Sequence, residues 1–169
     1  MNLESQIAQL TAQAQVIRGL TDGISPAQAA WKPGPDAWSV VEVVNHLYDE
    51  EREDFRAHFD TILAGPDAPW WPIDPQGWVK QRAYNQRDLA ESVEDFLRER
   101  ELSLVWLRGL TATNWDIAYP TPWGSITAGD MLAAWTAHDL LHIRQLVELR
   151  WQITVAAAAP YLVIYAGKW

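Results

Sequence analysis

The chain has 169 residues, enough for one domain with its own core, and 49% of them are hydrophobic. A formal net charge of −9 leaves no excess of cations to neutralise phosphates, so nucleic acids and anionic membranes are not expected partners. Because the sequence has no cysteine, it has no disulfide, thiolate metal site or cysteine nucleophile, and a metal ion would have to bind His, Asp or Glu. With no recognisable signal sequence or membrane span, we expect a single cytoplasmic domain over residues 1–169.

Four segments have apolar residues at spacings of three and four, which predicts amphipathic helices. They run from Leu3 to an end near Gly19–Gly23, from Ser39 to Ile62, from Asp88 to Arg108, and from Thr127 to about Trp151. The second and fourth begin with capping-box patterns, Ser39 with Glu42 and Thr127 with Asp130. In the third, the Glu and Arg residues are expected to face solvent.

The connections between these segments indicate the fold class. Residues 64–84 contain four prolines, which predicts a long crossover loop rather than a helix. Residues 155–169 are compatible with a short fifth helix or an extended tail. The alternation typical of strands is missing, so the sequence predicts an all-α four-helix bundle with a short C-terminal extension.

Two histidines lie on the predicted buried side of the fourth helix. The apolar and polar residues of that side recur at spacings of four and three: Met131, Trp135, His138, His142, Gln145 and Leu149. Residues four apart share a helix face, so His138 and His142 can direct ring nitrogens at one ion. His46 lies on the flank of the buried face of the second helix. If the two helices are neighbours, three imidazoles meet inside the bundle.

The remaining histidine, His58, lies twelve residues past His46, about 18 Å along an ideal helix and about 120° around it. We therefore expect it on the surface.

Asp139 stands where the metalloprotease helix motif needs Glu, which argues against a protease.

A metal ion explains the three histidines better than a hydrogen-bonded core does, because burying them with Glu50 and Gln145 uncompensated would be costly. Three neutral imidazoles leave coordination positions open for water or substrate, as in catalytic sites. Zn²⁺ is the first expectation, and Ni²⁺, Fe²⁺ and Mn²⁺ stay open. Glu50, one turn beyond His46, has three candidate roles: orienting a ligand, accepting a catalytic proton, or pairing with an arginine.

Two stretches of the sequence carry a family resemblance. The segment from Trp31 to Gly34, followed by Trp38 to Leu47, resembles the DinB-like superfamily of helical-bundle metalloproteins. The same holds for Trp123-Gly124 followed by Thr127 and the His138-x-x-x-His142-x-x-Gln145 pattern. The resemblance implies an up-down-down-up helix order, a metal triad at His46, His138 and His142, and homodimers. At Arg144 the chain departs from the family pattern, which often has Gly there.

Relatives in this superfamily imply an enzyme that transfers a low-molecular-weight thiol, such as bacillithiol, to an electrophile. Our main functional expectation is thus a metal-dependent thiol S-transferase acting on a small molecule. A metal-dependent hydrolase is the nearest alternative, and a non-catalytic protein that binds metal or a small ligand is another. A third is an interaction module in which Trp70 and Trp71 form a partner surface.

Overall fold

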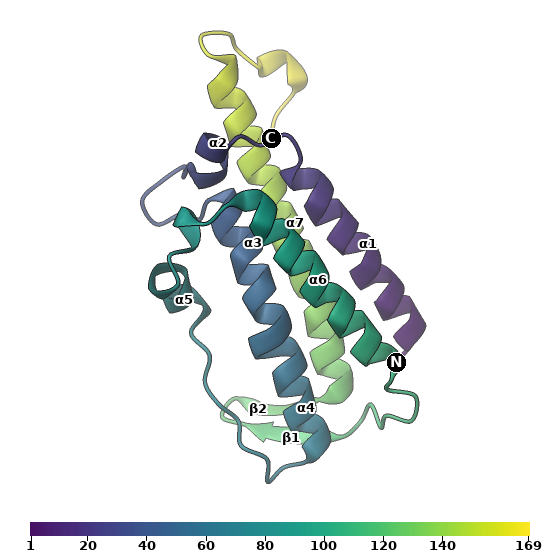
Figure 1. The fold of residues 1–169 in the computed structure, drawn as a ribbon. Helices are drawn as coiled ribbons and strands as arrows, with labels where there is room; N and C mark the ends of the chain where they lie inside the picture. The colour runs from purple at the N-terminus through teal and green to yellow at the C-terminus, as the bar shows by residue number, and fades with distance from the viewer.

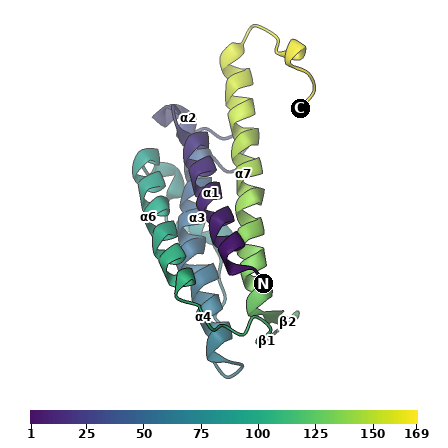
Figure 2. The same cartoon turned by 90° about the vertical axis from the view of Figure 1, so that its right-hand side faces the viewer.

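The computed structural model describes residues 1–169 and is built mainly of helices (Figure 1). The bundle consists of α1 (Leu3–Thr21), a long segment made of α3 (Val40–Asp49), η1 (Glu50–Phe55) and α4 (Arg56–Ala64), then α6 (Leu89–Arg108) and α7 (Ala128–Ala158). Helices α1 and α7 run in one direction, and the other two segments run in the opposite direction (Figures 1 and 2). The predicted four-helix bundle and its up-down-down-up order are therefore confirmed.

The second segment begins where the sequence predicts and then departs from a regular α-helix. Ser39 accepts a hydrogen bond from the Glu42 backbone N–H, and the Glu42 carboxylate accepts one from Ser39 N–H at 2.7 Å. Between Glu50 and Phe55 the helix is a π-helical turn. A π-helical turn is closed by i→i+5 hydrogen bonds, and its backbone rotates less per residue than an α-helix does. Residues at intervals of four before and after the turn therefore stay on one face of the segment. The expectation that His58 is a surface residue is consequently wrong, since it is 1% exposed.

The core consists of two apolar clusters stacked along the bundle. Fully buried members of one cluster include Leu10, Phe59, Leu107 and Leu132, and those of the other include Ile17, Val43, Phe96 and Leu146. Burial of such side chains is the main stabilising term in the fold.

A layer of buried polar side chains separates the two clusters. At its centre lies Arg100, which is 2% exposed, so the expectation that the charges of α6 all face solvent is wrong at this position. Its guanidinium donates to Glu51 Oε1 at 2.9 Å, to Asp139 Oδ2 at 2.7 Å and to the Leu10 carbonyl at 2.9 Å. The Trp135 indole N–H also donates to Glu51 Oε1, at 2.7 Å. One cation thus joins all four bundle segments.

Several short elements were not predicted from the sequence. The chain between α1 and α3 contains α2 (Pro26–Ala30), and the crossover contains α5 (Pro75–Gln81) and the 3-10 turn η2 (Tyr84–Gln86). Strands β1 (Ala118–Thr121) and β2 (Gly124–Thr127) form an antiparallel hairpin before α7. Helix α2 lies at one end of the bundle and the β1–β2 hairpin at the other, while α5 lies beside α3 (Figure 1).

The last helix is longer than predicted. Helix α7 ends at Ala158 rather than near Trp151, because residues 155–158 include strong helix formers and no Gly or Pro intervenes. It projects beyond the other helices (Figure 2), and the chain then forms the 3-10 turn η3 (Ile164–Ala166). None of the helices combines the length and the hydropathy that a membrane span requires.

Candidate metal centre

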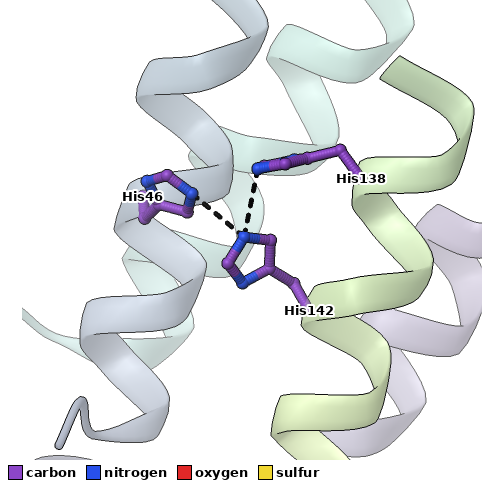
Figure 3. Close-up of side chains that lie close together, drawn as sticks. All are labelled: His46, His138 and His142. Carbon is purple, nitrogen blue, oxygen red and sulfur yellow. Dashed lines mark hydrogen bonds between the residues drawn. The ribbon is translucent and has the colours of Figure 1, made fainter. Parts of the chain in front are cut away.

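Three histidine side chains from two helices converge at the level of the polar layer. His46 comes from α3, and His138 and His142 come from successive turns of α7 (Figure 3). The Nε2 atom of His142 lies 3.0 Å from that of His46 and 3.1 Å from that of His138. Candidate ligand atoms of all three lie within 4.8 Å of one another, so the cluster could hold a metal ion. Helix α7 supplies the i, i+4 pair, and the cap at Ser39 sets where α3 presents His46.

The spacing of the ring nitrogens suits a tetrahedral ion. Zn–N bonds of about 2.0–2.1 Å at tetrahedral angles place two nitrogens about 3.3 Å apart. The two Nε2 separations given above are a few tenths of an ångström shorter, and the ligand atoms of His46 and His138 lie within 4.8 Å of each other. Small movements of the rings would therefore accommodate Zn²⁺.

The second ring nitrogens of His142 and His46 indicate which tautomers the site favours. His142 Nδ1 lies 2.8 Å from Gln145 Oε1, an amide oxygen that can only accept, so Nδ1 carries the proton and Nε2 keeps its lone pair. His46 Nδ1 is buried without a hydrogen-bond partner, and so is Glu50 Oε1, 3.6 Å away. An ion on His46 Nε2 would require the proton on Nδ1, where Glu50 Oε1 is the nearest acceptor. Both unpartnered atoms therefore agree with a metal on the Nε2 side.

Burial keeps the three rings neutral. Desolvation, with repulsion from the neighbouring histidines, lowers the pKa of His46 to about 2. Desolvation and His142 lower the pKa of His138 to about 4, and desolvation also lowers the pKa of His142. Since only a neutral imidazole binds a metal, the triad is ready to coordinate at neutral pH.

These lowered pKa values predict metal binding that is resistant to acid. Three unperturbed imidazoles with pKa values of about 6.5 would lose roughly a thousandfold in apparent zinc affinity between about pH 7.5 and 5.5. Here protons do not compete until the pH falls below the depressed pKa values, so we expect a change of about tenfold or less. Competition titrations against a chromophoric chelator at both pH values measure it, and a thousandfold loss would contradict these pKa shifts.

Glu50 differs from the neighbouring carboxylates, each of which pairs with an arginine or a histidine. Asp49 lies 2.6 Å from Arg82 Nη1, Glu51 pairs with Arg100, and Asp54 lies 2.6 Å from His58 Nδ1. Burial, followed by a hydrogen bond and repulsion from Asp54, raises the pKa of Glu50 to about 9. Glu50 thus lies next to His46 without a cation of its own.

A cavity of about 630 Å³ opens onto the three histidines. Its wall is formed by the loop before α3, by α5 and by α7, and includes Asp36, Trp38, Gln76, Gln145, Glu148 and Gln152. Glu50 is not among the lining residues, which places it behind His46 rather than beside a bound substrate. Arg144 borders an adjoining hollow that shares His138 and His142. Trp38 belongs to the stretch that carries the family resemblance, but no sequence pattern assigned it to a binding site, and none pointed to Gln76.

A family comparison agrees with this architecture. Residues 9–146 match the family model of the DinB superfamily. The chain belongs to the DinB superfamily. The structure also resembles YfiT from Bacillus subtilis, with a TM-score of 0.78 and 19% sequence identity, over 90% of this chain and 87% of that one. YfiT is described as a probable metal-dependent hydrolase with an unusual four-helix bundle topology. A search of curated proteins gave no match.

Proposed function

We propose that this DinB-superfamily protein is a metal-dependent hydrolase that acts on a small molecule. The observation that carries the proposal is the convergence of three neutral imidazole nitrogens at a cavity of about 630 Å³. A divalent ion held by three imidazoles would keep open positions and would supply an activated water molecule. Cavities of this size are typical for small-molecule ligands.

The residues around the ion would have different roles in hydrolysis. His46, His138 and His142 would hold the ion, with Zn²⁺ as the first candidate and Ni²⁺, Fe²⁺ and Mn²⁺ as the others. Glu50 would orient the His46 ring by accepting a hydrogen bond from its Nδ1–H at Oε1, the first of the roles expected from the sequence. Glu148 would accept a proton in the cavity, because its carboxylate forms part of the wall. Hydrogen bonds from Trp169 and Gln152 lower its pKa, so that it is ionised at neutral pH.

Hydrolysis is favoured here over the thiol transfer expected from the sequence. The relative with the same fold is described as a probable hydrolase. In addition, the cavity wall contains the carboxylates of Asp36 and Glu148 and no Lys or Arg. These two side chains would repel a thiol cofactor bearing carboxylates but not a neutral or amine-bearing substrate, and only the ion and Arg144 of the adjoining hollow would supply positive charge.

The test is an assay of zinc-loaded protein with chromogenic esters, amides and lactones, each measured with and without a low-molecular-weight thiol. We expect release of product that does not need the thiol and that falls at least about a hundredfold in His142→Ala. Turnover only with thiol, with the thiol consumed, would instead support the transferase. Tight ligand binding without turnover in either condition would support the non-catalytic alternative.

The cavity charge predicts the substrate preference. Among matched p-nitroanilides, one with a free ammonium group should show a higher kcat/KM than its succinylated, negatively charged counterpart. In the Glu148→Gln variant the ratio of the two kcat/KM values should fall, and so should the rate of hydrolysis of both substrates. In the Asp36→Asn variant only the ratio should fall. Equal kcat/KM values for both substrates in the wild type would contradict this assignment.

A further inference from the structure

Four titratable side chains stand at intervals of four residues along the second bundle segment: His46, Glu50, Asp54 and His58. We call them the polar row. His46 and Glu50 are 4% exposed, His58 is 1% exposed, and the Asp54 side chain is 16% exposed. A row of this length, largely shielded from water, needs a physical explanation, because buried polar groups are costly without partners.

Successive members of the polar row contact one another. His46 Nδ1 lies 3.6 Å from Glu50 Oε1, and Asp54 Oδ1 lies 2.6 Å from His58 Nδ1. Between them, Asp54 is the side chain that, after burial, contributes most to the raised pKa of Glu50, which places the two carboxyl groups close together. The π-helical turn from Glu50 to Phe55 keeps these residues in line, whereas a regular α-helix would carry His58 about 120° away from His46. Such turns occur frequently at functional sites.

The side chain of His58, at the far end of the polar row, is fixed by hydrogen bonds and by aromatic stacking. Its Nε2 lies 3.0 Å from the Trp71 carbonyl, which can only accept, so this nitrogen carries a proton. The ring stacks on Trp70 and Trp71, at centroid distances of 4.1 and 4.8 Å, which suits a cation. Burial alone would lower the pKa of His58, but the hydrogen bonds to Asp54 and Trp71 raise it overall. His58 is therefore a fixed donor to Asp54.

We propose that His58 is a positioning residue of the three-histidine centre, which fixes Asp54 and acts through Asp54 and Glu50 on the orientation of His46. The inference rests on the proposed metal site. His58 contacts neither the cavity nor the triad, so its effect would have to pass through the polar row.

The crossover loop offers a matched control. The Trp71 carbonyl that His58 contacts belongs to this loop, so a His58 variant also loses a loop anchor. Tyr119 forms a second anchor, since its hydroxyl donates to the Ala68 carbonyl at 2.6 Å. Tyr119→Phe removes that anchor without touching the polar row, which separates loop loosening from the effect proposed here.

The experiment compares zinc affinity, by chelator competition, in the wild type, His58→Gln, Asp54→Asn, the double variant and Tyr119→Phe. We expect each polar-row variant to weaken zinc binding about tenfold. This is the low end of the range for removing residues that hydrogen-bond to metal ligands without touching the metal. The double variant should weaken it no further, because both changes interrupt one connection. Tyr119→Phe should stay within about twofold of the wild type.

Each outcome decides one point. Unchanged affinity in His58→Gln, or an equal loss in Tyr119→Phe, would overturn the positioning role while leaving the metal site intact. A wild type that binds no zinc would instead refute the proposed function and, with it, this inference. Should the polar-row variants not fold, NMR of the wild type provides the test: zinc should shift the hydrogen-bonded Nδ1 proton of His58, and an unmoved signal would overturn the proposal.

Discussion

The His142→Ala variant is expected to lose zinc affinity by about a hundredfold to a thousandfold, as removal of one of three ligands should. His142 has the largest expected effect because its Nε2 contacts both other rings and Gln145 fixes its tautomer. The measurement is thermal unfolding with and without zinc. At a free zinc concentration of 100 times Kd, binding adds about 2.7 kcal/mol to the stability of the wild type. The variant should show almost no zinc-dependent rise.

Glu148→Gln provides the control for this experiment. Glu148 lines the same cavity but is not among the three clustered ligands, so the variant should keep the zinc-dependent rise. An equal rise in wild type and His142→Ala would mean that zinc binds elsewhere on the protein.

The Arg100→Met variant is expected to lower the free energy of unfolding by about 3–5 kcal/mol. Arg100 is 2% exposed, and its removal would leave the carboxylates of Glu51 and Asp139 buried without their cation. The Leu10 carbonyl would lose its donor as well. Denaturant unfolding of the metal-free protein measures the effect, since no bound ion then contributes to stability.

Arg98→Met is the matched control, because Arg98 lies one half-turn away on the same helix and pairs with Asp95 at the surface. Its side chain is 67% exposed. An exposed ion pair contributes about 1 kcal/mol at most, so this variant should stay close to the wild type. Similar losses in both variants would show that the buried network does not carry the stability assigned to it.

The parts of this molecule that repeat with helical periodicity could be predicted from the sequence. Four helices, two of their caps and the inward direction of His138 and His142 all follow from residues at spacings of three and four. The meeting of His46 with that pair required only that the two helices be neighbours, and the structure brings them together. That these residues bind a metal is still a prediction.

The burial of two residues, His58 and Arg100, was predicted wrongly, because it depends on features that the helical periodicity of the sequence does not show. The surface position expected for His58 assumed a regular α-helix, and the π-helical turn changed the phase. Arg100 lies among exposed Glu and Arg residues in the sequence, while its partners Glu51 and Asp139 are 49 and 39 residues away. Local patterns cannot identify a charge that is buried by distant partners.

The short elements were missed for a related reason. Asp74 and Pro75 are a good helix start, with the Asp74 carboxylate accepting from Gly77 N–H, but the surrounding prolines favoured a loop. Because α5 was not expected, Gln76 could not be assigned to the cavity wall. The β1–β2 hairpin has only four residues in each strand, too few for a clear alternation.

The central claim is that the three histidines hold one metal ion, and anomalous diffraction at the zinc edge from zinc-loaded crystals tests it most directly. We predict one strong peak about 2.0–2.1 Å from Nε2 of His46, His138 and His142, with His46 Nδ1 within hydrogen-bonding distance of Glu50. A peak elsewhere, or no peak in crystals grown with excess zinc, would contradict the metal centre and the hydrolase proposed from it.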